Sequence, residues 1–303
     1  MLAHRRFFAI VSSWMLLLLA AAPATVFSQE GIEEVSIQDN SFLIEEAYNQ
    51  EKGIIQHIFN WVPSWDVDHG VRHRESDFLF TQEWPVFSQT HQFSYSIPIN
   101  RFTDQALGGP IVESEGIGDI MLNYRYQALG GKGQELSFSP RFSVILPSGD
   151  ENQGLGDGKV GYQINLPVSK EFDHWCFHFN AGTTLTPGVT AGVDPQWVLP
   201  GQPLTGYNLG GSAIYKLRPN FHLMLETLAV WDEELTPEGH KDRAFQLQVS
   251  PGFRWAPYTK GEVQWVLGVA TPIGLTRDAP DVSLFFYMSF EHPFTIAPRA
   301  DAN

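Results

Sequence analysis

The stretch ELSFSPRFSVILPSGD, residues 135–150, carries an apolar side chain at every second position. Between Leu136 and Val144 these apolar positions are separated by serines and by Arg141. Alternation with a period of two predicts a β-strand with two unlike faces. A soluble sheet would turn its apolar face to a core, whereas a membrane barrel turns that face to lipid and its polar face to an enclosed lumen. The side that Arg141 faces therefore distinguishes the two architectures.

The first 28 residues have the order of a secretory signal peptide. Arg5 and Arg6 precede an apolar run, and small residues follow it. This order predicts export, with cleavage after Ala24 or Ser28. A membrane-anchoring helix is the alternative for this run, and its short length and proline-containing flank disfavour it.

The chain is acidic and holds a single cysteine. Removal of the signal would change the formal net charge from −15 to −17, which argues against nucleic acid as a partner. With only Cys176, an exported chain cannot form an internal disulfide, so another device must stabilise it. No motif points to catalytic, metal-binding or cofactor-binding residues, so we expect no enzyme activity and no cofactor.

After residue 53 the sequence predicts about twelve strands and no helix. The strands are expected near 53–63, 76–87, 91–102, 117–128, 136–147, 159–171, 174–185, 204–217, 221–232, 243–256, 262–272 and 281–290. The short connections are 88–90, 130–134, 172–173, 218–220 and 257–261. The long ones are 64–75, 103–116, 148–158, 186–203, 233–242 and 273–280. Short and long connections alternate strictly, so a meander would place all the short turns at one end, as in outer-membrane barrels.

The polar faces of these strands define the residues expected to line a lumen. A lumen enclosed by about twelve strands is narrow, and buried charges of both signs in it need partners or water. Glu83 and Glu226 are the acids expected near the inward arginines. The complete set is Glu83, Asp119, Asn123, Arg125, Gln127, Arg141, Gln163, Asn165, Asn180, Glu226, Gln246, Gln248, Arg254, Glu262 and Gln264.

Two pairs of charged residues are expected to meet across neighbouring strands. Arg254 and Glu262 flank the turn at 257–261 symmetrically, which predicts an ion pair between them. Arg125 and Arg141 share the inward face of two adjacent strands and are expected about two residues away from direct opposition.

Three segments resemble a known outer-membrane family. They are LIEEAYNQEKGIIQHIFNW (43–61), GIGDIMLNYRYQAL (116–129) and FSPRFSVILPSGDENQGLGDGKVGYQINLPVSKEF (138–172). The family is labelled a putative component of meta-pathway phenol degradation, its members are often called transporters, and it is similar in outline to the long-chain fatty-acid uptake barrels. The resemblance spans roughly residues 41–290 and implies the passage of small apolar or aromatic compounds.

We therefore expect an all-β protein, a monomeric transmembrane antiparallel up-and-down barrel in the outer membrane of a Gram-negative-type bacterium. Its parts would be a signal peptide (1–28), a periplasmic segment with a possible short helix (29–52), the barrel (53–290) and a periplasmic tail (291–303). Outer-membrane lipid, lipopolysaccharide and a small solute are the expected partners. The expected function is passive passage of small solutes, with a lumen that is open, gated or plugged by residues 30–52. The alternatives are a non-conducting barrel with a sealed polar lumen and an exported soluble β-sandwich that binds a ligand.

Overall fold

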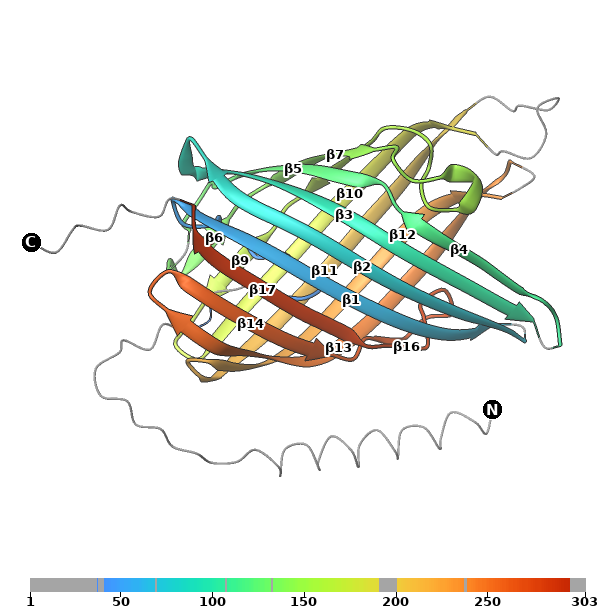
Figure 1. The fold of residues 1–303 in the computed structure, drawn as a ribbon. Helices are drawn as coiled ribbons and strands as arrows, with labels where there is room; N and C mark the ends of the chain where they lie inside the picture. Colours follow the sequence, from blue (N-terminus) through green and yellow to red (C-terminus); the bar gives the residue numbers. More distant parts are fainter. Residues whose placement is uncertain are drawn as a thin grey trace, which may run out of the picture. The chain divides into compact units, whose positions relative to one another are not determined.

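The structure is a computed structural model that describes residues 37, 41–68, 70–106, 108–131, 133–190, 201–236 and 239–294. Within these residues, seventeen strand segments join into one sheet and make up the twelve strands of a closed antiparallel barrel (Figure 1). The segments are β1 (Ile54–Asp68), β2 (Val71–Val86), β3 (Ser88–Ala106), β4 (Ile111–Ile117), β5 (Ile120–Tyr126), β6 (Leu136–Phe138), β7 (Arg141–Leu146), β8 (Gly161–Asn165), β9 (Val168–Glu171), β10 (Trp175–Val189), β11 (Gln202–Arg218), β12 (Phe221–Leu235), β13 (Lys241–Lys260), β14 (Val263–Ala270), β15 (Ile273–Gly274), β16 (Val282–Ser283) and β17 (Phe285–Pro293). No helix in the described part of the chain is long and apolar enough to cross a membrane.

The barrel closes between its first and last strands. In β1, Phe59 is paired with Phe80 of β2 on one side and with Met288 of β17 on the other. A sheet that pairs with itself has no free edge, and all its backbone groups find partners within the wall. The predicted all-β barrel of about twelve strands is confirmed.

Five interruptions divide the twelve barrel strands into seventeen segments, and prolines account for three of them. Pro140 separates β6 from β7, Pro167 separates β8 from β9, and Pro272 separates β14 from β15. Proline has no N–H to donate, so it interrupts the hydrogen-bond ladder while the chain continues in the same direction.

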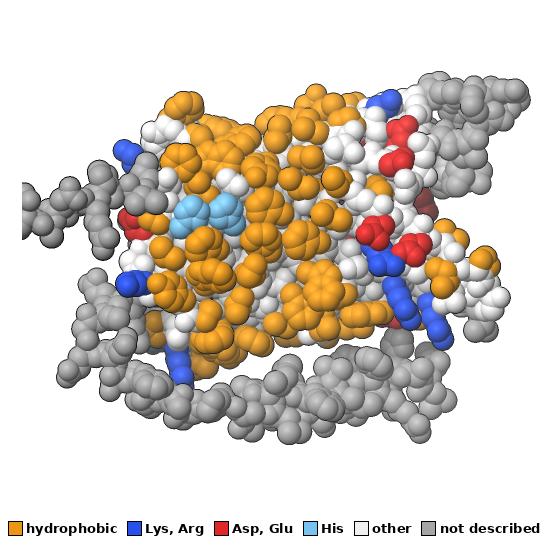
Figure 2. Space-filling model, viewed as in Figure 1, with side chains coloured by type: hydrophobic (Ala, Val, Ile, Leu, Met, Phe, Trp, Pro, Cys, Tyr) orange, Lys and Arg blue, Asp and Glu red, His pale blue; other side chains and the backbone are white. Residues whose placement is uncertain are grey.

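The two faces of the wall answer the question posed by Arg141. Its side chain is 15% exposed and points into the barrel, whereas the next residue, Phe142, is 45% exposed on the outer surface. Figure 2 shows the result over one whole side, where apolar side chains form a broad band and charged side chains gather towards both ends. Apolar-out, polar-in alternation is typical of a barrel surrounded by lipid.

Two of the expected long loops are wrong. β1 continues to Asp68 and β2 begins at Val71, in place of a loop at 64–75, and β3 and β4 similarly occupy most of 103–116. Polar cross-strand pairs hold these extensions together: His73 Nδ1 lies 2.7 Å from Asp104 Oδ1, and Arg101 pairs with Glu113. Such pairs stabilise a ribbon that has no apolar face to bury. Residues 147–160 do form a long connection, with a 3₁₀ turn at Glu151–Gln153.

Several expectations fall on the ends of the chain. The signal peptide at 1–28 lies outside the described residues, as does the tail beyond residue 294. The last strand extends slightly past the expected limit of residue 290, to Pro293.

Candidate functional site

Residues 41–50, here called the plug, lie inside the barrel. They form no helix, whereas the sequence suggested a possible short one within residues 29–52. The plug has no helical turn and pairs with no strand among the described residues. Its backbone is bound instead by side chains that point inward from the wall. These contacts position the plug across the lumen.

Glu226 on β12 holds the first part of the plug. Its Oε1 accepts three successive backbone N–H bonds, from Phe42 at 3.1 Å, Leu43 at 3.0 Å and Ile44 at 3.2 Å. Glu226 is 1% exposed. One buried carboxylate thus satisfies three buried donors, and charge-assisted bonds of this kind are stronger than neutral ones.

Side-chain amides and a hydroxyl hold the rest of the plug. Asn180 accepts the Glu45 N–H at 2.6 Å and donates to the Glu45 carbonyl at 2.9 Å. Further along, Ser169 accepts the Ala47 N–H at 2.8 Å, and Gln127 accepts the Asn49 N–H at 2.9 Å. The wall therefore supplies partners that a helix would otherwise have supplied.

The charged centre of the lumen joins the plug to two arginines. Arg125 and Arg141 are direct partners across β5 and β7, closer than the diagonal arrangement expected from the sequence. The Glu45 carboxylate binds both: it accepts from Arg141 Nε at 3.0 and 2.9 Å and from Arg125 Nη2. Arg125 Nη1 also donates to Glu46 at 3.0 Å. The plug's own acids, Glu45 and Glu46, thus form ion pairs with the arginines, whereas the expected Glu226 binds the backbone of the plug.

The pKa values of the two acids of the plug shift in opposite directions. Burial alone would raise the pKa of Glu45, but Arg141 and Arg125 outweigh it and lower that pKa to about 2. For Glu46, burial prevails over the attraction of Arg125, with Glu83 and Glu45 adding repulsion, and its pKa rises to about 7. Desolvation favours the neutral carboxyl and a nearby cation favours the ionised one.

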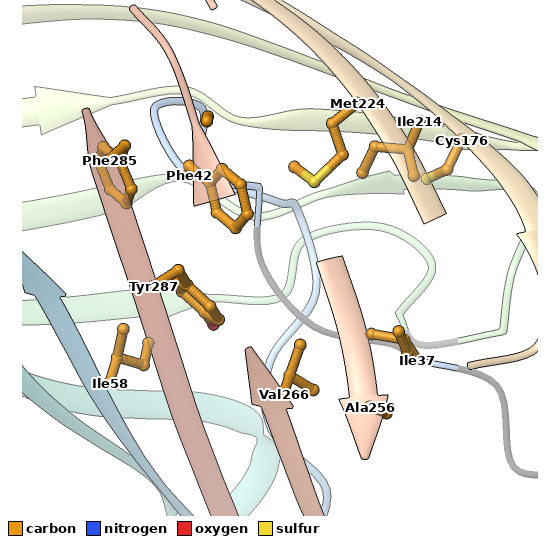
Figure 3. Packing of buried hydrophobic residues seen from close by; sticks show 11 residues of the cluster. Ile37, Phe42, Ile58, Cys176, Ile214, Met224, Ala256, Val266, Phe285 and Tyr287 are labelled. Carbon is orange, nitrogen blue, oxygen red and sulfur yellow. The ribbon is translucent and has the colours of Figure 1, made fainter. Parts of the chain in front are cut away.

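Apolar side chains pack part of the plug against the inner face of the wall. Figure 3 shows Phe42 of the plug against Phe285 and Tyr287, with ring centroids at 5.3 and 5.1 Å. The wall is hollowed for the plug by glycine: a Cβ on Gly268 would lie 2.2 Å from the Phe42 ring, and one on Gly210 would lie 2.3 Å from Ile44 Cδ1. The cluster comprises Ile37, Phe42, Ile58, Cys176, Ile214, Met224, Ala256, Val266, Ala270, Phe285 and Tyr287.

A cavity of about 570 Å³ occupies the half of the lumen nearest the long loops. The plug forms its floor, through residues that include Phe42 and Glu45. One side of the cavity is polar, with Arg141 and its neighbours, and β12 contributes apolar side chains, Leu228 and Val230. The volume lies within the range of small-molecule sites.

Most residues expected in the lumen surround the plug or the cavity. Those that touch the plug are Arg125, Gln127, Arg141, Asn165, Asn180 and Glu226. Asn123 and Gln163 accept from Arg141, each at 2.9 Å. Glu83 accepts from Gln92 at 2.9 Å, and Gln92 in turn accepts the Gln50 N–H at 2.7 Å. Asp119 lines the cavity and accepts the Gly149 N–H at 2.9 Å.

The remaining expected residues lie away from the plug. Gln246 and Gln248 lie on β13 with the parity of the buried Ser250 and Arg254. Gln264 is buried near the short turns. The expected pair of Arg254 and Glu262 is wrong: Arg254 is opposite Gly268, and Glu262 is exposed in a turn that comes later than expected. A bulge between Trp255 and Tyr258 lets β13 run on to Lys260, which shifts the register.

Sequence reasoning missed the acids of the plug. Glu45 and Glu46 lie outside every strand, so a rule of inward parity could not select them. The available signal was a mismatch of charge, because two inward arginines on adjacent strands need acids nearby.

A serine and a histidine also meet in the lumen. Ser169 Oγ lies 2.7 Å from His178 Nδ1, and both residues are buried. The same oxygen accepts the Ala47 N–H at 2.8 Å. In this arrangement the pair anchors the plug.

Solved structures with the same fold are outer-membrane barrels. An outer membrane channel from Pseudomonas putida F1 matches 81% of this chain and 97% of its own, with a TM-score of 0.63 and 11% identity. The transport unit of the autotransporter AIDA-I from Escherichia coli matches 84% of this chain and 95% of its own, with a TM-score of 0.50 and 10% identity. No protein-family model and no curated protein matches the chain. Likeness at this identity shows the fold of an outer-membrane β-barrel.

Proposed function

We propose that this protein is a monomeric outer-membrane channel for passive passage of small solutes, in which the plug must move before a solute can pass. The observation that carries the proposal is the contrast between wall and plug. The wall is one closed sheet of strands joined by backbone hydrogen bonds, whereas the plug is held by side-chain contacts to its backbone, by the ion pairs of its acids and by the packing of Phe42. The plug can therefore be released without opening a single strand pair.

The outer membrane is supported as the location by the apolar band on the barrel exterior (Figure 2) and by the fold of the neighbours. Long loops would then face outward and short turns the periplasm. A solute entering from outside would reach the cavity first and stop at the plug.

The lining of the cavity supports small solutes that have an apolar or aromatic part. Leu79, Leu228 and Val230 offer apolar side chains, and Asn165 and Arg141 offer hydrogen-bond donors. The resemblance to the phenol-degradation family implies the same class of compound.

A specific observation favours the runner-up, a structural barrel that never conducts. The apolar cluster around Phe42 packs the plug against the inner face of the wall (Figure 3). Phe42 is 8% exposed, and its burial contributes roughly 1.5–3 kcal/mol to keeping the plug in place.

A reversible lock on the plug separates these functions. Ser41 Oγ of the plug lies 2.7 Å from Ser212 Oγ of the wall, so the S41C/S212C variant, in a C176A background, should form a disulfide. Conductance would be measured in a planar bilayer before and after reduction. We expect channel openings in the reduced form and none in the oxidised form.

A matched disulfide controls for the cross-link itself. Ser64 and Ser283 are partners within the wall, with their Oγ atoms 2.7 Å apart, so S64C/S283C staples two strands and leaves the plug free. This variant should conduct in both redox states. Equal conductance of the oxidised and reduced forms of S41C/S212C would contradict a moving plug. Absence of conductance in both variants and both redox states would favour the structural barrel.

A further inference from the structure

The carboxylate of Glu45 sits in a receptor built by three adjacent strands. Arg125 on β5, Arg141 on β7 and Asn165 on β8 are successive cross-strand partners at one level of the wall. All three donate to Glu45: Arg141 Nε at 2.9 Å, Asn165 Nδ2 at 2.6 Å, and Arg125 Nη2. Two guanidinium groups and an amide converging on one carboxylate provide both charge and directed donors.

This receptor opens onto the cavity. Glu45, Arg125, Arg141 and Asn165 all contribute to its lining, and the apolar side chains of the opposite wall face the same space. The Nε of Arg125 is buried and has no hydrogen-bond partner among the described residues. A molecule in the cavity therefore meets a carboxylate receptor on one side and apolar surface on the other.

From this geometry we propose that the cavity binds small amphipathic monocarboxylates, and that their carboxylate replaces Glu45 on Arg125 and Arg141 and so releases the plug. The inference rests on the proposed function, since it names the class of solute and the event that moves the plug. Glu45 is in effect a tethered copy of the ligand's charged group.

Charge balance explains why the ligand exchanges with Glu45 and does not simply add to the site. Arg125 and Arg141 carry two positive charges, and three acids, Glu45, Glu46 and Glu83, already act on Arg125. A further carboxylate would be repelled, whereas an exchange for Glu45 leaves the net charge unchanged. Glu46 remains on Arg125, at 3.0 Å.

The tether also sets the strength of binding. A group held on a short flexible segment competes at an effective concentration on the order of millimolar. The affinity of the intact protein for a free carboxylate should therefore be weak, which allows a solute to leave again.

Binding of carboxyl-¹³C benzoate to the full mature chain in detergent micelles, followed by NMR, tests the proposal. Benzamide, which has the same shape without the charge, serves as the comparison ligand. Glu45→Gln removes the tethered competitor and should raise the affinity for benzoate at least about tenfold while leaving benzamide unchanged. Arg141→Gln should abolish saturable benzoate binding.

Asp119→Asn is the matched control. Asp119 lines the same cavity but accepts the Gly149 N–H at 2.9 Å, and within the described part of the chain it forms no hydrogen bond or ion pair with either arginine. Its neutralisation removes one negative charge from the cavity, as E45Q does, and should change benzoate affinity less than about twofold, because only distant screened charge is lost. If E45Q fails to fold, Glu45→Asp withdraws the carboxylate from the arginines and should change benzoate affinity in the same direction.

Three results would overturn the inference. Benzamide could bind with the same affinity as benzoate, D119N could raise the affinity for benzoate as much as E45Q does, or E45Q could leave the affinity for benzoate unchanged. Failure of the proposed function is distinguishable. A barrel that binds benzoate but shows no conductance would refute the channel function and support the carboxylate site. A barrel that conducts but does not bind benzoate would refute the carboxylate site alone.

Discussion

Replacing Glu226 by alanine tests how the plug is held. The Oε1 of Glu226 accepts the N–H groups of Phe42, Leu43 and Ile44 at 3.0 to 3.2 Å. A hydrogen bond contributes about 1 kcal/mol net, and more when it involves a charged group. Loss of three bonds should therefore weaken docking of the plug by about 3 kcal/mol, which corresponds to an increase of about 100-fold in the released population.

Hydrogen exchange measured by mass spectrometry on the mature protein in micelles would detect this change. The amides of residues 42–44 should exchange about 100-fold faster in E226A, while peptides from the wall keep their wild-type protection. Glu226→Gln retains an acceptor oxygen and loses only the charge, so its effect should be smaller. Unchanged exchange at residues 42–44 in E226A would refute the assigned role of Glu226. Faster exchange throughout the wall would mean that Glu226 stabilises the barrel and not the plug.

Four further outcomes are expected. Arg125→Met leaves Glu46 without its arginine and should lower the free energy of unfolding by about 3–5 kcal/mol, measured by urea denaturation in detergent; an unchanged midpoint would contradict the ion pairs. Burial raises the pKa of Glu46 to about 7, and the two arginines lower that of Glu45 to about 2. Docking of the plug should weaken as pH rises from 4.5 to about 7, because released Glu46 gives up a proton that docked Glu46 keeps. Docking should weaken again as pH falls from 4.5 towards 2, because released Glu45 takes up a proton that docked Glu45 does not. Hydrogen exchange of residues 41–50, corrected for the intrinsic effect of pH, should become faster on both sides of pH 4.5, and E46Q should lose the increase at higher pH. Gly210→Val should expel Ile44 and raise conductance, whereas Gly211→Val, on the outer face where a Cβ meets Phe179 at 3.5 Å, should not; equal effects would point to a general change in the wall. In a C176A background, cysteine at Asp150 should react with an impermeant thiol reagent on whole cells and cysteine at Asn220 should not; the reverse would invert the proposed orientation.

The barrel strands could be predicted from the sequence because the signal that marks them, alternation of apolar and polar residues, lies within each strand. Alternation between Leu136 and Val144 has a period that only a strand provides, and it assigns each side chain to a face without knowledge of the partner strand. That Phe142 and Arg141 lie on opposite faces follows from parity alone. Strand ends were less predictable: His73, Asp104 and Glu113 lie in polar stretches that resemble loops, and only pairing with a neighbouring strand makes them part of the sheet.

Register and the contents of the lumen were decided by tertiary structure. The bulge between Trp255 and Tyr258 separates Arg254 from Glu262, and such a bulge depends on how two strands meet. The plug depends on contacts as distant in sequence as Phe42 and Glu226, or Glu45 and Arg141. Its residues show no periodicity of their own, because a segment whose N–H groups are bound by a surrounding wall needs neither a helix nor a strand. The sequence by itself thus determined which residues of a strand share a face, since alternation is a property of each strand, while closure of the barrel determined what the inward residues hold.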